Sequence, residues 1–284
     1  MEVSPQQKAH IMIESLSYIK KFHQQIVVIK YGGNAMINEE LKQAVIKDIT
    51  LMKYVGMNPV VIHGGGPEIT EAMERFGKKP TFIDGLRVTD KVTMELTEMV
   101  LCGKISSQIV SLMNANDVRA VGISGKDANT IMVKQKNKAL GLVGEVVEIN
   151  TDYLNNIIQN GYVPIISPIG VGPDGQSYNV NADEVAGRIA VALNAKKLVL
   201  ITDVEGVMMD AKDPTTLISE IRAYEVEDYI ESGTIKGGMI PKIQCCMGAV
   251  NNGVERCHII DGRKFHSILL EIFTDAGIGT MITK

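Results

Sequence analysis

The sequence contains no tryptophan, and aromatic residues make up only 5% of its 284 residues. Proteins that bind single-stranded nucleic acid commonly stack bases on aromatic side chains, so this scarcity argues against such a surface. Long basic blocks are also missing: 29 lysines and arginines stand against 33 acidic residues, and the formal net charge is −4. These shortages together argue against nucleic-acid binding driven by phosphate charge.

Apolar runs and cysteines are also limited. No run approaches the roughly 20 apolar residues of a membrane helix, and the opening Met1–Gln6 lacks the features of a signal peptide. We therefore expect no membrane contact and a cytoplasmic location. The four cysteines, at positions 102, 245, 246 and 257, form no C-x-x-C pair. They predict free thiols rather than a metal site.

The hydrophobic content of 45% predicts a sizeable core, in one large domain or two small ones. Short apolar runs alternate with segments of helical periodicity. Strands are expected at Ile26–Lys30, Pro59–Ile62, Ala120–Ile123, Leu142–Ile149, Val163–Ile166, Lys197–Ile201 and Arg256–Ile260. Helices are expected at Glu39–Val55, Glu68–Phe76, Lys91–Asn114, Asp152–Asn160, Glu184–Leu193, Lys242–Asn252 and Ser267–Phe273. The alternation predicts an α/β fold with an open, mostly parallel sheet covered by helices on both faces.

An additional amphipathic helix is expected at residues 5–23, before the first strand. Ser4 suits an N-cap, and Pro5 suits the first helical turn. This helix either covers an edge of the sheet or pairs with another subunit, and we favour the second interpretation.

Two glycine turns follow the first two strands, at the sheet edge where ligands bind in such folds. Gly32-Gly33 comes just after Lys30, and Gly64–Gly66 precedes a helix. Glycines let backbone amides crowd around an anion, a helix N-terminus adds positive potential, and lysine supplies a charge suited to phosphate. The sequence therefore predicts a phosphate site here, although it has no Walker P-loop motif.

Four further polar segments are candidate site elements, each with a plainer alternative. Arg87 can hold a carboxylate with two hydrogen bonds, or be a solvated surface residue. Asp183, near Asn179, can cap the following helix or orient lysines. Residues 202–206 can contact a nucleotide or form an ordinary loop. Lys242 begins a helix against the preference of the dipole, which suggests a functional task.

A G-x-G-x-x-G pattern occurs at Gly170–Gly175. It follows an apolar run, as a dinucleotide-binding fingerprint would. However, Pro173-Asp174-Gly175 is typical of a tight turn, and the residues after it look extended. We therefore predict a hairpin here rather than NAD binding.

Six segments in this order resemble the amino-acid kinase family and, within it, the N-acetylglutamate kinases. They are Val27–Met36, Val61–Ile69, Asp84–Asp90, Asn179–Ala186, Leu200–Met208 and Gly237–Lys242. The resemblance spans nearly the whole chain, and HGGGP and NVNAD are its more specific parts. It implies a single kinase domain over residues 1–284 with an open αβα sandwich. Its parts would be an oligomerisation helix (1–23), an amino-acid lobe (24–178) and a nucleotide lobe (179–284).

The resemblance also implies roles for individual residues. The catalytic group would be Lys30 and Lys242, which hold the transferring phosphoryl group, and Asp183, which holds both lysines. The substrate would be bound by Gly65, Gly66, Arg87 and Asn179. The nucleotide would contact Gly32, Gly33, Thr202, Asp203, Gly206, Gly237 and Met239.

The implied reaction is ATP-dependent phosphorylation of the side-chain carboxylate of N-acetyl-L-glutamate, in arginine biosynthesis. That carboxylate has an ordinary pKa of about 4.3 and is already ionised at neutral pH, so no general base is needed. Two anions must meet, so lysines and backbone amides would supply the catalysis. Mg²⁺ would be held mainly by the phosphates of ATP, with no dedicated metal ligands in the protein.

The two ends of the chain resemble those of the arginine-inhibited members, which form hexamers as trimers of dimers. The corresponding arginine site would include Tyr18, Lys196, Glu271 and Gly277. A nitrogen-signalling partner protein is compatible with this resemblance but is not indicated by any motif.

Three alternatives remain open at this stage. Sister kinases that act on carbamate, aspartate, glutamate or UMP share the fold, although Asp84–Asp90 together with NVNAD favours acetylglutamate. A non-catalytic sensor could bind arginine or nucleotide, but it need not keep Lys30, Asp183 and Lys242. NAD binding would rest only on Gly170–Gly175.

Overall fold

The computed structural model describes residues 4–210, 213–275 and 277–284, so residues 1–3 of the predicted N-terminal segment lie outside it. The main sheet has eight strands, which lie side by side in the order β12-β14-β13-β11-β1-β2-β8-β5. Its strands are β1 (Ile26–Tyr31), β2 (Asn58–His63), β5 (Ala120–Ser124), β8 (Val163–Ser167), β11 (Lys197–Thr202), β12 (Glu220–Arg222), β13 (Arg256–Asp261) and β14 (Thr280–Thr283). Neighbours are parallel except β13 and β14, which confirms the expected α/β fold with a mostly parallel sheet.

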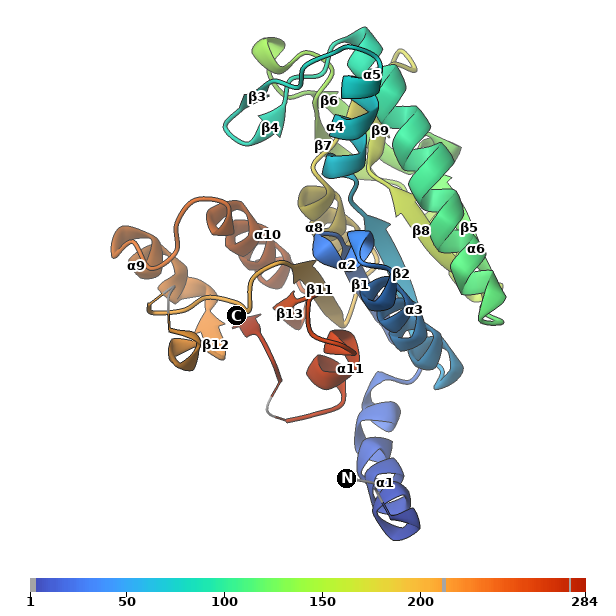
Figure 1. The fold of residues 1–284 in the computed structure, drawn as a ribbon, viewed down its shortest axis with the longest axis vertical. Helices are drawn as coiled ribbons and strands as arrows, with labels where there is room; N and C mark the ends of the chain where they lie inside the picture. The colour runs from blue at the N-terminus through green and yellow to red at the C-terminus, as the bar shows by residue number, and fades with distance from the viewer. Residues whose placement is uncertain (1–3, 211–212, 276) are drawn as a thin grey trace.

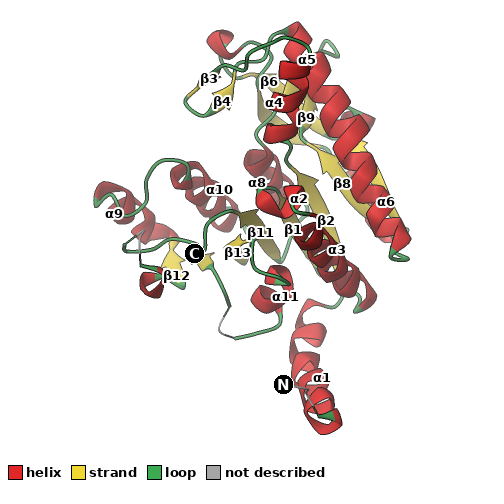
Figure 2. Cartoon of the chain, viewed as in Figure 1, coloured by secondary structure: helices red, strands yellow, loops and turns green. Residues whose placement is uncertain are grey.

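Helices cover both faces of this sheet, because its strands carry apolar side chains in both directions (Figures 1 and 2). One face packs against α7 (Asp152–Gln159), α8 (Ala182–Ala192) and α10 (Met239–Asn251). The opposite face packs against α3 (Glu39–Tyr54), α4 (Gly66–Arg75), α5 (Lys91–Glu98), α6 (Ser107–Ala115) and α11 (Ser267–Ile272). In β1, Val28 belongs to the first core, whereas Val27 and Ile29 belong to the second.

The segment predicted as one helix from Lys91 to Asn114 is not uniformly α-helical. A π-helical stretch, η1 (Met99–Ser106), separates α5 from α6. Its buried Leu101 and Ile105 reach the second glycine turn, where a Cβ on Gly65 would lie 2.6 Å from Leu101 Cδ2. The altered helical geometry therefore contributes to the wall of the site described below.

A smaller sheet has the order β10-β9-β6-β7 and lies at the same end of the molecule as α5 (Figure 1). Its strands are β6 (Ile131–Gln135), β7 (Gly144–Ile149), β9 (Ile169–Val171) and β10 (Ser177–Asn179). The strand expected at Leu142–Ile149 corresponds to β7, and β6 was not predicted. The antiparallel pair of β9 and β10 confirms that Gly170–Gly175 forms a hairpin.

The N-terminal helix α1 (Pro5–Phe22) extends away from the rest of the molecule (Figure 1). Ser4 caps it together with Gln7, as a capping box. Phe22 is buried against the body, whereas Ile11, Met12 and Ile13 are exposed. Among the described residues, no helix combines the length and the apolar character needed to cross a membrane.

The remaining elements are short. They are the helices α2 (Asn34–Ile37) and α9 (Val226–Glu231), the hairpin β3 (Phe82–Ile83) and β4 (Leu86–Arg87), and the 3₁₀ turns η2 (Asp127–Asn129), η3 (Lys138–Leu140), η4 (Pro214–Thr216) and η5 (Ala223–Glu225).

Candidate active site

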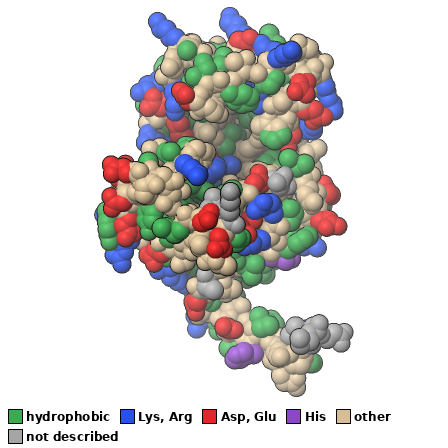
Figure 3. Space-filling model, turned by 60° about the vertical axis from the view of Figure 1, so that its left-hand side comes forward, with side chains coloured by type: hydrophobic (Ala, Val, Ile, Leu, Met, Phe, Trp, Pro, Cys, Tyr) green, Lys and Arg blue, Asp and Glu red, His purple; other side chains and the backbone are tan. Residues whose placement is uncertain are grey.

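The two glycine turns lie side by side because β1 and β2 are parallel neighbours in the middle of the sheet. The amide of Gly64 donates to the carbonyl of Tyr31 at 2.8 Å, which links the second turn to the end of β1. A cavity of about 160 Å³ lies between the turns, and Lys30 and Asp183 line it together with both glycine turns. Figure 3 shows a recess in the middle of one face of the molecule, with lysine or arginine side chains at its edge.

Asp183 lies between the two lysines that the sequence singles out. Lys242 donates to Asp183 Oδ2 at 2.6 Å, and Lys30 Nζ lies 3.2 Å from Oδ1. The side chains of Lys30 and Asp183 are each 12% exposed, and that of Lys242 is 20% exposed. Burial opposes ionisation of Asp183, but the two ammonium groups outweigh it and lower the pKa of its carboxyl. The result is a carboxylate that holds two cations at the cavity.

Asp183 does not cap α8, so the capping alternative is wrong. Asn181 is the N-cap, and its Oδ1 accepts from the amides of Asp183 and Glu184 at 2.9 and 3.1 Å. The carboxylate of Asp183 is therefore available to the lysines. Lys242 lies in the first turn of α10, which begins at Met239 rather than at Lys242 as expected.

The first glycine turn is shaped by two neighbouring side chains. The lysine of β1 folds back over the turn, so that a Cβ on Gly32 would lie 2.7 Å from Lys30 Nζ. Gly33 has a φ of 71°, in the left-handed region, and a Cβ there would lie 2.8 Å from Asp203 Oδ2. The backbone of Gly33 therefore favours glycine, whereas a side chain at position 32 would displace the ammonium group of Lys30.

A second cavity, of about 220 Å³, contains all four residues predicted to bind substrate: Gly65, Gly66, Arg87 and Asn179. Arg87 Nη2 donates to the carbonyl of Gly66 at 2.9 Å and to Thr70 Oγ1 at 2.8 Å. Its guanidinium carbon lies 4.8 Å from the centre of the Phe82 ring. Arg87 is thus a fixed, largely buried cation rather than a solvated surface arginine.

Thr89 connects two of these residues. It is fully buried, and its Oγ1 donates to the carbonyl of Arg87 at 2.8 Å and accepts from Asn179 Nδ2 at 3.3 Å. Sequence reasoning quoted Thr89 only as part of a motif. Its position two residues from Arg87, on the same side of an extended segment, is the signal that could have identified it.

The residues predicted to contact nucleotide are more dispersed. Gly237 lies with Lys242 and Asp183 along a groove of about 1210 Å³ between α8, α10 and β7, whereas Thr202, Gly206 and Met239 are not among its lining residues. Met239 packs against the apolar core, and a Cβ on Gly206 would lie 2.8 Å from Leu217 Cδ1. At these two positions, packing by itself accounts for the residue.

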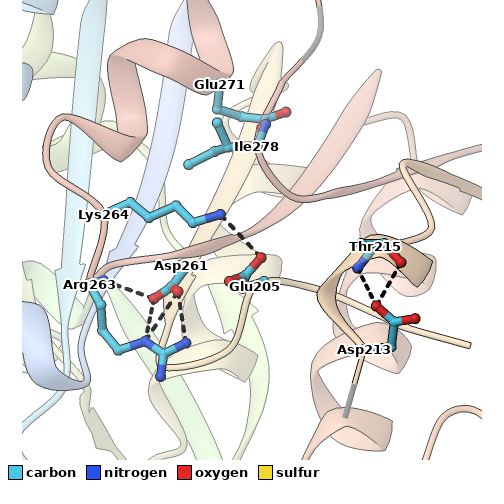
Figure 4. A network of polar contacts seen from close by, with 8 residues as sticks. All are labelled: Glu205, Asp213, Thr215, Asp261, Arg263, Lys264, Glu271 and Ile278. Atoms are coloured by element: carbon cyan, nitrogen blue, oxygen red, sulfur yellow. Dashed lines mark hydrogen bonds and ion pairs between the residues drawn. The ribbon is translucent and has the colours of Figure 1, made fainter. Parts of the chain in front are cut away.

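Three charged residues that the sequence reasoning missed, Asp261, Arg263 and Lys264, lie at the end of β13, close to Glu205 after β11 (Figure 4). The guanidinium of Arg263 donates to both oxygens of Asp261 at 2.8 to 3.1 Å, and Lys264 Nζ lies 3.2 Å from Glu205 Oε2. Both ion pairs lie where β11 and β13 end, in the same region as Thr202 and Asp203. Their position directly after a predicted strand could have identified them from the sequence, because ligands in such folds bind at the carboxyl ends of the strands.

A third cavity, of about 290 Å³, lies where α1 meets the body of the molecule and contains three of the four residues predicted for arginine: Tyr18, Glu271 and Gly277. Tyr18 donates to Asp275 Oδ1 at 2.5 Å. Glu271 Oε2 accepts from the amide of Ile278 at 2.8 Å, and Oε1 lies 2.5 Å from Nδ1 of His258.

Lys197 and Lys21 line this cavity, whereas the predicted Lys196 does not. Lys196 forms an ion pair with Glu255 and does not line the cavity. Lys197 is 5% exposed, lies 4.9 Å from the centre of the Phe22 ring, and has its pKa lowered to about 8 by burial. The cavity therefore contains a buried cation and a buried carboxylate.

Comparison with known proteins assigns the family. The model of the amino acid kinase family matches residues 25–261. The chain belongs to the amino acid kinase family. The acetylglutamate kinase of Alkaliphilus metalliredigens (strain QYMF) is 64% identical over 283 residues, which cover 100% of this chain and 90% of that protein. The acetylglutamate kinase of Pelotomaculum thermopropionicum is 53% identical, and the match covers 99% of each chain.

Solved structures show the same fold in another enzyme. The N-acetylglutamate synthase of Neisseria gonorrhoeae, complexed with coenzyme A and N-acetyl-glutamate, superposes with a TM-score of 0.85 at 24% identity. The match covers 97% of this chain but 63% of the synthase. The same synthase complexed with coenzyme A and L-arginine superposes with a TM-score of 0.81 at 23% identity. The chain thus has the amino acid kinase fold.

Proposed function

We propose that this chain is an acetylglutamate kinase of arginine biosynthesis. It transfers the terminal phosphoryl group of ATP to the side-chain carboxylate of N-acetyl-L-glutamate. The observation that carries this proposal is the pair of lysines held by Asp183 at the first cavity, next to a second cavity that Arg87 and Asn179 line. Full-length similarity to acetylglutamate kinases supports the choice of acceptor.

The charges of the site suit this chemistry. The acceptor carboxylate is ionised at neutral pH, so the reaction brings one anion against another and needs cations where charge develops. Lys30 and Lys242 supply these cations at two sides of the phosphoryl group. Asp183 holds both ammonium groups in place, so that they need not reorganise during transfer.

The substrate is held by its other end. Arg87 pairs with the α-carboxylate, and Asn179 offers an amide to the acetamido group. Because Thr70, Gly66 and Phe82 already hold Arg87 in place, little side-chain freedom is lost on binding. Backbone amides of the two glycine turns bind the phosphate oxygens between these groups.

Mg²⁺ fits this arrangement as an ion carried by ATP. The carboxylate of Asp183 already faces two lysines, so it is poorly suited to bind a metal directly. When bound with ATP, Mg²⁺ would neutralise negative charge on the phosphates. Activity should therefore require Mg²⁺, and titration of MgCl₂ at fixed ATP tests this requirement.

The direct test of the proposed function is ADP release with MgATP and a panel of acceptors: N-acetyl-L-glutamate, glutamate, aspartate and carbamate. Release confined to N-acetyl-L-glutamate is the expected result. Release with another acceptor would move the assignment to a sister kinase. No release with any acceptor would favour a non-catalytic sensor that binds arginine or nucleotide.

We also propose that arginine inhibits the enzyme from the third cavity. Glu271 pairs with the guanidinium, Tyr18 and Gly277 contribute to the wall, and Lys197 takes the place predicted for Lys196. An L-arginine complex of a protein with this fold gives the proposal further support. Glu271→Gln should raise the arginine concentration for half inhibition about tenfold or more, because a hydrogen bond to a charged group contributes about 1.5–3 kcal/mol.

We further propose a hexamer built as a trimer of dimers, in which α1 pairs with another subunit. The apolar side chains of Ile11, Met12 and Ile13 are exposed on α1, and pairing with another subunit would bury them. Deletion of residues 1–16 would remove most of α1 but keep Tyr18 and Phe22, which line the third cavity. That variant should lose the hexamer in light scattering and keep turnover; a hexamer that survives the deletion would refute this role of α1.

The predicted division into lobes is retained as a proposal. The sheet supports it, because β5, β8, β2 and β1 come from residues 24–178 and β11, β13, β14 and β12 from residues 179–284. We also propose a cytoplasmic location, because the reaction consumes ATP.

A further inference from the structure

His63 is a fully buried polar residue to which the proposed reaction gives no role. It ends β2, directly before the second glycine turn. Both ring nitrogens have partners: Nδ1 lies 2.9 Å from the carbonyl oxygen of Gly64, and Nε2 lies 3.0 Å from Ser167 Oγ at the end of β8. A buried ring with two partners is oriented by the fold.

The contacts of His63 define its hydrogen atoms. A carbonyl oxygen only accepts, so Nδ1 carries the hydrogen and donates it to Gly64. Burial lowers the pKa of His63 to about 4, so the ring is neutral at neutral pH and Nε2 has no hydrogen. Nε2 therefore accepts from the hydroxyl of Ser167. The ring acts as a rigid link from β8 to the carbonyl of Gly64.

That carbonyl belongs to the same peptide unit as the amide of Gly65. In a trans peptide the C=O and N–H bonds point in opposite directions. A ring that holds the carbonyl of Gly64 thus directs the Gly65 amide away from the ring. Gly64 and Gly65 both line the two adjoining cavities, and within the described part of the chain the Gly65 amide is bonded to no other backbone group.

We propose that His63 is a positioning residue: it holds the Gly64–Gly65 peptide so that the Gly65 amide donates to the phosphoryl group during transfer. This inference rests on the proposed function. Glycine peptides rotate more freely than others because no Cβ restricts them. The amide of Gly64 is already bonded to Tyr31, so the bond to His63 fixes the other side of that residue.

Two substitutions of similar polarity test the roles of the two ring nitrogens separately. The amide nitrogen of His63→Asn can take the place of Nδ1 and donate to Gly64. The longer side chain of His63→Gln places its amide near Nε2, beside Ser167, and leaves Gly64 without a donor. Ser167→Ala is the control, because it removes the bond at Nε2 and leaves the bond to Gly64.

The experiment measures kcat and KM with MgATP and N-acetyl-L-glutamate, together with the thermal unfolding midpoint of each variant. His63→Gln should lose kcat by about tenfold to a hundredfold, because small misplacements of a catalytic group have effects of that size. His63→Asn and Ser167→Ala should stay within about threefold of wild type, a difference too small to reflect a misplaced donor. Equal kcat values for the Asn and Gln variants, or an equal loss in Ser167→Ala, would overturn the proposal.

Crystal structures of the two His63 variants keep this inference separate from the proposed function. Wild-type protein that phosphorylates no acceptor would refute the proposed function. The positioning role is then judged on the Gly64 carbonyl, which should keep its direction in His63→Asn and rotate in His63→Gln. An unchanged peptide in His63→Gln would refute the role of His63 even in an active enzyme.

Discussion

Substitution of Asp183 by asparagine removes one negative charge and almost no volume. Two ammonium groups, from Lys30 and Lys242, then face a neutral amide in a cavity. The amide oxygen can accept from one lysine, but the amide nitrogen is a donor and faces the other. We therefore expect one lysine to leave its position, and the site to lose the geometry that brings both cations to one phosphoryl group.

The expected loss of stability depends on how deeply the ion pairs are buried. Breaking a fully buried ion pair costs about 3–5 kcal/mol. The lysine side chains here are 12% and 20% exposed and can turn toward water. The stability loss should therefore be nearer to the about 1–3 kcal/mol of an unsatisfied polar group. Turnover should fall further, by about a hundredfold to a thousandfold, as for loss of a donor that stabilises transition-state charge.

The assays are steady-state ADP release and urea unfolding at several pH values. The pKa of Asp183 is lowered in the fold, so its stabilising contribution is present above the ordinary carboxyl pKa and is lost as pH falls through the lowered value. The stability difference between wild type and Asp183→Asn should thus shrink in acid. Asp152→Asn, an exposed carboxylate in α7, is the control. A variant with kcat within threefold of wild type would refute the reasoning, because such a change falls far below the about 2.7–4 kcal/mol expected.

Three further predictions concern neighbouring residues. Gly32→Ala should lower kcat about tenfold or more with little change in fold, because its Cβ would displace Lys30 Nζ, 2.7 Å away; unchanged kinetics would show that the lysine can move without loss. Arg87→Lys should raise the KM for N-acetyl-L-glutamate about tenfold, since lysine cannot form two parallel bonds to a carboxylate; isothermal titration measures this loss, and unchanged affinity would contradict it. The wild-type protein should lose stability as pH falls from 6.5 toward 4, by up to about 1.4 kcal/mol per pH unit, because the unfolded chain protonates His63 first. Urea unfolding of His63→Asn should show a shallower dependence, and an identical slope would contradict the assignment.

Much of the fold was predictable because its signals are local. Each apolar run such as Ile26–Lys30 is bounded by polar or glycine residues, and the helices between them have clear periodicity. Strand β6 was missed, although its Ile131 and Val133 are buried. It pairs with the nearby β7 and, through Met132 and Val171, with β9, so only its contact with β9 joins segments distant in sequence.

The candidate site was only partly predictable. Lys30 and Lys242 stood out because each interrupts a local preference, Asp183 stood out as part of a polar cluster, and the structure places the three together. The arginine site was predicted with Lys196, and of these two neighbouring lysines it is Lys197 that lines the third cavity. Side chains alternate across a strand, so one residue decides which face a lysine occupies, and only the packing of β11 shows that Lys197 faces Phe22.

The sequence alone therefore determined the class of fold, the edge of the sheet where phosphate is expected, and the charges available there. Those features depend on residue type, periodicity and the order of strands. Tertiary structure decided which residues meet: that Asn181 rather than Asp183 caps α8, that Thr89 joins Arg87 to Asn179, and that His63 reaches Ser167. The contacts of Thr89 with Asn179 and of His63 with Ser167 join segments far apart in the chain, so they arise only when both cores pack on the sheet. The cap at Asn181 is local and depends on the residue at which α8 begins.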